Sequence, residues 1–181
     1  TLDAVMLLRV PEDMRAFLLL ILYAAWTMLA FASEDPKAKD TTGTVTGLSI
    51  PRFASLKSSQ VNIRTGPGKR YPIDWVIVRK GMPVEIIAEH DIWRKIKDWQ
   101  GTEGWVHHAM LSGRRSVLIT GQNVILRKKP AADAAPVIKL APMIAAFVER
   151  CTNDWCQVET DNFKGWLMIK DIWGIKTGEV F

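Results

Sequence analysis

The sequence contains few of the residues that build metal and catalytic sites. Its 181 residues include only two cysteines and three histidines. His107 and His108 are consecutive on an expected strand, where successive side chains point to opposite faces, so they cannot readily chelate one ion. His90 stands apart from them, at an expected turn. The sequence therefore predicts no metal site.

Catalytic and nucleotide-binding motifs are also absent from the sequence. The run Gly66 to Arg70 faintly resembles a phosphate loop, but Ile63 stands where such a loop requires glycine and Arg70 where it requires Ser or Thr. No Gly-x-Ser-x-Gly motif is present, and no nucleophile, base and orienting group form a recognisable set. We therefore expect a protein that is not an enzyme and needs no cofactor.

Long helical patterns are missing from Phe53 onward. Short apolar alternations are interrupted by Gly and Pro about every eight to twelve residues, which is typical of a small β-barrel or sandwich. The Gly- and Pro-rich segment Arg64 to Asp74 cannot continue a strand and is expected to be a long loop. The expected strands are 53–63, 75–79, 83–89, 92–98 and 103–107, followed by 116–126, 137–140, 144–151, 155–160 and 164–168. The sequence therefore predicts an all-β fold.

An internal repeat divides this all-β region in two. The segment VNIRTGPGKRYP, Val61 to Pro72, returns as VILRKKPAADAAP, Val124 to Pro136. The repeat extends through Trp-Arg-Lys-Ile and Trp-Cys-Gln-Val, at 93–96 and 155–158, and through Gly-Trp-Val and Gly-Trp-Leu, at 104–106 and 165–167. A unit of about sixty residues exceeds the usual solenoid repeats and is just large enough for its own core. We therefore expect tandem domains at 53–113 and 114–175, and a tail at 176–181.

The N-terminal part of the chain has the pattern of an export signal. Arg15 precedes the uncharged run Ala16 to Ala32, which ends in the small-x-small pattern that signal peptidase accepts. This run is shorter than the roughly twenty residues of a membrane span. We therefore expect residues 1–32 to be a signal peptide or leader that contacts the membrane only transiently, with a retained anchor as the alternative. Residues 33–52 are polar and are expected to be a flexible tether.

The positive charge of the chain is concentrated in the first repeat. The formal net charge is +5, and residues 56–115 hold eleven Lys and Arg against six Asp and Glu, whereas residues 116–181 hold eight against seven. Electrostatic attraction is therefore expected mainly from the first domain. Export and scattered charge argue against a nucleic-acid partner.

The two cysteines are close in sequence. Cys151 and Cys156 flank Thr-Asn-Asp-Trp at an expected hairpin turn. In an exported protein this spacing favours a disulfide, with a free buried thiol pair as the alternative.

Several short segments in order resemble a known domain family. VNIRTGPG, YP, RKGMPVEII, IWRKI and EGWV resemble the bacterial SH3-like (SH3b) domain, and LSGRR followed by a second copy resembles tandem SH3-like proteins exported by Gram-negative bacteria. The second copy departs from the pattern, with Lys128-Lys129-Pro130 in place of Thr65-Gly66-Pro67. The resemblance covers residues 53–173 and implies two five-stranded SH3-like barrels. It also implies a non-catalytic binding role, often near the cell wall, in the periplasm or cell envelope.

The aromatic residues of the first domain suggest where a ligand binds. If Ile96 and Val106 face the core, strict alternation turns Trp93 and Trp105 outward or half-outward, within reach of the loop that carries Tyr71. Such an aromatic groove would hold an extended peptide or a peptidoglycan stem. Two alternatives stay open: the loop covers these rings as a second core layer, or the protein is an adaptor that docks to an envelope enzyme or complex. The candidate ligand-binding residues are Tyr71, Trp93, Trp105, His107, Lys69 and Arg70.

Overall fold

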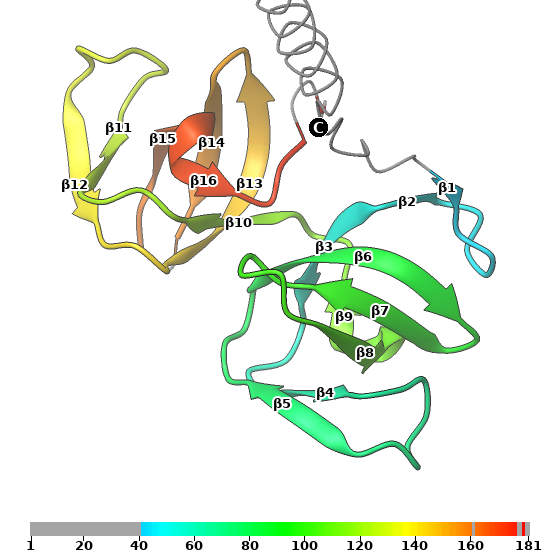
Figure 1. Ribbon diagram of the computed structural model, residues 1–181. Helices are drawn as coiled ribbons and strands as arrows, with labels where there is room; N and C mark the ends of the chain where they lie inside the picture. The colour runs from blue at the N-terminus through cyan, green and yellow to red at the C-terminus, as the bar shows by residue number, and fades with distance from the viewer. Residues whose placement is uncertain (1–40, 161, 177–178, 180–181) are drawn as a thin grey trace, which may run out of the picture. The chain divides into compact units, whose positions relative to one another are not determined.

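The structure is a computed structural model that describes residues 41–160, 162–176 and 179. It contains two seven-stranded antiparallel sheets and one small hairpin (Figure 1), which confirms the expected all-β class. The expected signal peptide at 1–32, and residues 33–40 of the expected tether, lie outside the described residues.

The first domain is one curved antiparallel sheet. Its strand order is β5-β4-β8-β7-β6-β3-β9, so β5 lies at one edge of the sheet. Its strands are β3 (Arg52–Leu56), β4 (Val61–Arg64), β5 (Ile73–Ile77), β6 (Pro83–His90), β7 (Trp93–Lys97), β8 (Glu103–His107) and β9 (Leu111–Ser112), and the 3₁₀ helix η1 (His108–Met110) precedes β9.

The second domain repeats this arrangement element by element. Its strand order is β12-β11-β15-β14-β13-β10-β16, which matches the order of the first domain strand for strand. Its strands are β10 (Ser116–Ile119), β11 (Val124–Arg127), β12 (Pro136–Leu140), β13 (Ala145–Thr152), β14 (Trp155–Glu159), β15 (Lys164–Met168) and β16 (Ile172–Trp173), and the 3₁₀ helix η2 (Ile169–Asp171) precedes β16.

Each sheet has seven strands instead of five, for two reasons. The expected strands 53–63 and 116–126 are each divided in two, at 57–60 and 120–123, and each domain adds a two-residue strand, β9 or β16. The division lets the chain change neighbours: β3 pairs with β6 and β9, whereas β4 pairs with β5 and β8. A strand that changes partners in this way must bend, and the bend ends its regular pairing.

Each domain has its own apolar core. Ile96 and Val106 are buried in the first core, as expected from the alternation of β7 and β8. Most of the other buried side chains there belong to β3, β4 and β6, and the second core uses mostly the equivalent strands. The central residues are Leu56, Val61, Ile63, Val84 and Ile86 in the first domain, and Val117, Ile119, Val124, Leu126, Val158 and Leu167 in the second.

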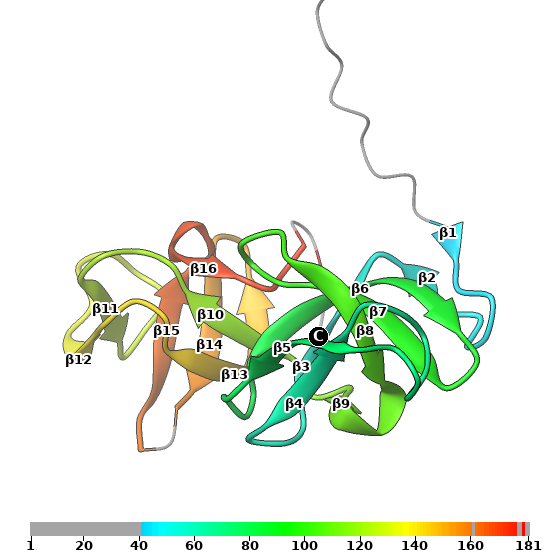
Figure 2. The same cartoon turned by 60° about the horizontal axis from the view of Figure 1, so that its bottom comes forward.

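The stretch expected to be a flexible tether is folded where the structure describes it. Strands β1 (Thr41–Thr42) and β2 (Ser49–Ile50) form a hairpin beside the end of β6 (Figure 1, Figure 2). The Glu89 carboxylate accepts hydrogen bonds from the backbone N–H groups of Val45 and Thr46, at 3.0 and 2.9 Å. Ile50 is buried in the first core. The tether interpretation is therefore wrong for residues 41–52, because a distant side chain holds this polar segment.

The two sheets also contact one another. Leu118 of β10 belongs to the first core cluster, and Trp173 of β16 packs against it. The Trp173 ring stands edge-on to Phe53, with ring centroids 5.0 Å apart. Apolar packing between the domains therefore supplements the short linker.

Candidate functional site

The loop at 65–72 is held in one shape by Arg64. One guanidinium nitrogen, Nη1, donates to the backbone oxygens of Tyr71 and Lys69, at 2.7 and 3.2 Å. A Cβ added to Gly66 would lie 2.4 Å from the Tyr71 ring, so only glycine allows the ring to pack there. Tyr71 is therefore a fixed, half-buried ring at the surface.

The tip of this loop is positively charged. Lys69 and Arg70 are both exposed. The Arg70 guanidinium lies over the Tyr71 ring, 5.1 Å from its centroid, and donates to the Tyr71 hydroxyl at 3.3 Å. This hydrogen bond, together with the charge interaction with Tyr71, raises the pKa of Arg70. The loop thus presents two cations beside a phenol, a combination suited to an anionic or hydrogen-bonding ligand.

Trp105 lies close to the base of this loop. Arg64 is paired directly with Ile73 on β5 and with Trp105 on β8, and Trp105 is in turn paired with Lys95 on β7. The Trp105 ring is half-buried, and His90 stands edge-on to it at a centroid distance of 6.4 Å. The sheet register therefore places Trp105 next to Arg64, which holds the base of the Tyr71 loop. We call Trp105 together with Lys69, Arg70 and Tyr71 the Trp105 face.

Trp93 differs from the expectation. It is only 7% exposed, although it lies outside the main cluster of apolar side chains in the first domain. His107, which is half-buried, stands edge-on to the Trp93 ring at 5.6 Å. The expected outward or half-outward exposure of Trp93 is therefore wrong, because alternation sets the direction of a side chain but not what covers it.

The histidine geometry also differs from the expectation. The His107 and His108 rings are stacked at 4.9 Å instead of pointing to opposite faces, because β8 ends at His107 and η1 begins at His108. The His107 Nδ1 accepts a hydrogen bond from the Ala109 N–H at 3.1 Å. Within the described residues, no group of three or more His, Cys, Asp or Glu side chains is placed to hold a metal ion.

The sequence interpretation overlooked the apolar surface of β5. Its residues and the adjacent Val78 include four exposed large apolar side chains: Ile73 at 46%, Trp75 at 57%, Val76 at 44% and Val78 at 73%. β5 is also an edge strand, and such edges can pair with an added peptide strand. The excess of large apolar residues at 73–78, directly after the Gly-rich loop, was the signal that could have revealed this surface.

The second domain closes the surface that corresponds to the Trp105 face. Arg150 lies over the Trp166 ring, 5.2 Å from its centroid, and Trp166 is only 6% exposed. Arg150 is paired with Gln157 and Gln157 with Trp166. In the first domain the same register places Ala88 at the position of Arg150. Ala88 is too short to cover a neighbouring indole, so Trp105 stays partly open.

The expected disulfide between Cys151 and Cys156 is confirmed. It joins directly paired positions on β13 and β14, next to the hairpin turn. No helix in the described part of the chain is long and apolar enough to cross a membrane.

Comparisons with known proteins identify the domains. The model of the bacterial SH3 domain matches residues 57–113 and 120–174. No curated protein matches the sequence significantly. Similar solved structures include NlpC2 and NlpC1 of Trichomonas vaginalis, each 7% identical with a TM-score of 0.32; the alignments cover 68% and 72% of this chain and 48% of each of those chains.

A further similar structure is an NlpC/P60 family protein of Bacillus cereus, 13% identical with a TM-score of 0.31; the alignment covers 67% of this chain and 55% of that one. This chain thus aligns with about half the length of each of these structures. Both repeats, which together make up most of the chain, match one family model, and the chain therefore belongs to the bacterial SH3 domain family as a tandem pair.

Proposed function

We propose that this protein is a non-catalytic binding module of the bacterial envelope, which holds an extended peptide or a peptidoglycan stem on its first domain. The observation that carries the proposal is the difference between the two tryptophans: Trp105 is partly open beside a cationic loop, whereas Trp166 is buried beneath Arg150. Membership of the bacterial SH3 domain family supports a binding role.

The surface offers three kinds of contact to such a ligand. The half-exposed rings of Tyr71 and Trp105 supply apolar area at a low cost in side-chain entropy. Lys69 and Arg70 attract acidic groups. The exposed edge strand β5 supplies backbone donors and acceptors, together with the indole of Trp75. An extended ligand is favoured because these contacts follow one another along the sheet.

The proposed location is the periplasm or the envelope. The disulfide supports an oxidising compartment, since such bonds are rare in the bacterial cytoplasm. Export through the leader, with cleavage after Ala32, belongs to the same proposal. Intact-mass measurement of protein from the native host tests it, and Ser33 is the first residue expected.

Sedimentation of the full chain with purified, protein-free peptidoglycan tests the binding role. We expect the protein to co-sediment, and Trp105→Ala to reduce the bound fraction at least tenfold while Trp155→Ala does not. Thermal unfolding of both variants shows whether the domains remain folded. Loss of binding only through unfolding would contradict a ligand role for Trp105.

An adaptor that docks to an envelope enzyme or complex is the second candidate. The exposed apolar residues of β5 favour it, because contiguous exposed apolar side chains mark surfaces for protein partners. Absence of peptidoglycan binding, with capture of an envelope protein that requires Trp75, would select the adaptor.

A further inference from the structure

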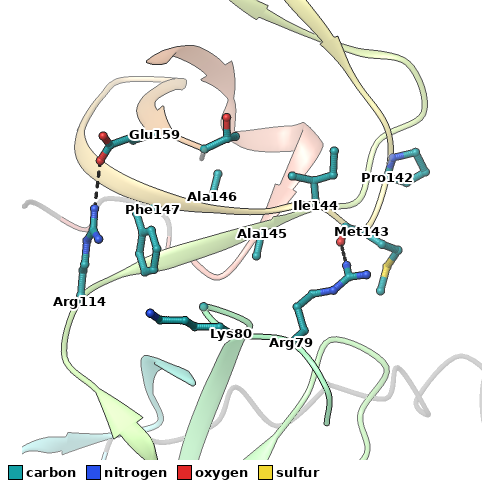
Figure 3. A pocket seen from close by; sticks show the side chains of 12 residues that line it. Arg79, Lys80, Arg114, Pro142, Met143, Ile144, Ala145, Ala146, Phe147 and Glu159 are labelled. Atoms are coloured by element: carbon teal, nitrogen blue, oxygen red, sulfur yellow. Dashed lines mark hydrogen bonds and ion pairs between the residues drawn. The ribbon is translucent and has the colours of Figure 1, made fainter. Parts of the chain in front are cut away.

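A cavity of about 600 Å³ lies where the two sheets meet, away from the Trp105 face. One side is formed by Arg79, Lys80 and Gly81, before β6, and the other by the start of β13. Figure 3 shows the apolar side chains of Ile144 and Ala145 on the wall opposite Arg79 and Lys80. Cavities of roughly 300 to 1,000 Å³ accommodate small organic ligands.

The charged groups around the cavity are mostly cationic. Arg79, Lys80 and Arg114 line it, and Glu159 is the only carboxylate among the lining residues. Arg114 already neutralises Glu159 at 3.1 Å and lies over the Phe147 ring at 3.7 Å. These contacts fix one end of the cavity and leave the opposite end positively charged.

The other two cations, Arg79 and Lys80, can still bind an anionic group. Arg79 donates through Nη1 to the backbone oxygen of Met143, so its other guanidinium N–H groups have no partner among the described residues. Lys80 makes no ion pair with any described residue. Figure 3 shows its side chain running below Phe147. Two cationic groups at the rim of an apolar wall suit a ligand that is both anionic and partly aliphatic.

We propose that this cavity binds a short peptide through its C-terminal carboxylate. Lys80 and Arg79 hold the carboxylate, and small apolar side chains of the peptide lie against Ile144 and Ala145. The wall is closely packed, because a Cβ added to Gly81 would lie 3.2 Å from the Phe147 ring. The geometry is thus largely preformed, which reduces the entropic cost of binding. This site is separate from the proposed Trp105 face and does not depend on it.

The test is a titration of the full chain with acetyl-Val-Ala-Ala and with its C-terminal amide, followed by NMR or calorimetry. We expect the free acid to bind saturably, and the amide to bind at least tenfold more weakly because it lacks the charge. Lys80→Gln is expected to weaken binding of the acid at least fivefold. Lys139→Gln is the matched control: it removes the same charge from an exposed position on β12, outside the cavity, and should leave the affinity unchanged.

Five outcomes would overturn the proposal. Equal affinity for the acid and the amide would exclude recognition of the carboxylate, as would the absence of saturable binding. Equal effects of Lys80→Gln and Lys139→Gln would reduce the interaction to general electrostatics. Inorganic phosphate that competes as strongly as the peptide would indicate a simple anion site, and loss of binding in Trp105→Ala but not in Lys80→Gln would assign the peptide to the Trp105 face instead.

Discussion

The two domains stabilise equivalent hairpins with different side-chain chemistry. Cys151 and Cys156 are paired across the β13–β14 hairpin, and the same register in the β6–β7 hairpin pairs Glu89 with Arg94. The hairpin turns also correspond, since Asp91 and Asn153 both have a φ of 48°. The covalent bond is complete within its own hairpin, whereas the carboxylate can accept further hydrogen bonds. The difference explains why the 41–50 hairpin can attach at Glu89, whereas the equivalent Cys151 offers no such acceptor.

The Glu89 carboxylate is the centre of that additional contact. None of its side chain is exposed, and it accepts hydrogen bonds from Arg52 at 2.7 Å and from the Thr46 hydroxyl at 2.7 Å. Arg94 lies 3.5 Å from the same carboxylate. A Cβ added to Gly43 would lie 2.6 Å from Glu89, so the hairpin backbone approaches the carboxylate closely. One buried charge thus connects the turn between β1 and β2 with β3 and β7.

The long loops at 65–72 and 128–135 share the same backbone hydrogen bonds but differ in their side chains. Arg127 Nη1 donates to the backbone oxygen of Ala134 at 2.7 Å, as Arg64 does to that of Tyr71. The backbone hydrogen bonds of Gly68 and Tyr71 recur at Ala131 and Ala134. The second loop therefore keeps the scaffold without the aromatic ring, which is the expected result if only the first loop contacts a ligand.

Substitution of Glu89 should cause the largest loss of stability, and it should affect the first domain. Glu89→Gln leaves the buried Arg94 without a charged partner, and breaking a buried pair typically costs about 3–5 kcal/mol. We expect the first domain to lose that stability and the 41–50 hairpin to detach. Thermal unfolding measures the first effect, and hydrogen exchange at the Val45 and Thr46 amides measures the second.

Glu85→Gln is the matched control for this substitution. It breaks the Glu85–Lys97 pair, in which Lys97 is 38% exposed, and should cost less than about 1 kcal/mol. If both variants lose the same stability, Glu89 has no special role in the first domain.

Removal of the disulfide should have the next largest effect. Its loop is short, so the chain-entropy model gives a loss of about 2 kcal/mol. We expect the double variant Cys151→Ser, Cys156→Ser to lower the melting temperature of the second domain and to leave the first unchanged. Two free thiols in unreduced protein from the native host would contradict the disulfide.

Exchange of the residues at the equivalent positions 88 and 150 should alter ligand binding. The expected change in free energy is smaller than that from loss of the disulfide. Ala88→Arg places a guanidinium where it can cover Trp105, and we expect peptidoglycan binding to weaken about tenfold, or about 1.4 kcal/mol. Arg150→Ala should expose Trp166, which increased quenching of tryptophan fluorescence by acrylamide would detect. Undiminished binding by a folded Ala88→Arg variant would show that the ligand does not contact Trp105.

Acidification should give the smallest effect near neutral pH. Burial raises the pKa of Glu89, but the hydrogen bonds from Thr46, Arg52 and Val45 outweigh it and lower the pKa from 4.5 to about 2. The stabilisation is therefore fully present above about pH 4.5 and is lost as the pH falls toward 2. We expect the free energy of unfolding of the first domain, measured with denaturant, to fall as the pH drops across this range. Glu89→Gln should lack the part of this pH dependence that Glu89 contributes. Equal pH dependence in both proteins would refute the assignment.

Local patterns in the sequence were sufficient for the fold. Alternating apolar residues, Gly and Pro at turns and the internal repeat predicted two all-β domains, and the spacing of Cys151 and Cys156 predicted their disulfide. These features depend on neighbours within a few residues or on repetition of the same pattern. Strand divisions at 57–60 and 120–123 were missed, because they depend on which distant strands the chain meets.

The exposure of the candidate site was decided only by the tertiary structure. Trp93 and Trp105 share an outward direction on paired strands, yet the first is buried and the second is half-exposed. Whether a ring is covered depends on the side chain that the register places beside it, as Ala88 and Arg150 show. The contact of residues 41–50 with Glu89 likewise joins positions more than forty residues apart. The sequence by itself determined the direction of each strand residue, and the packing of distant segments determined which of them remain accessible.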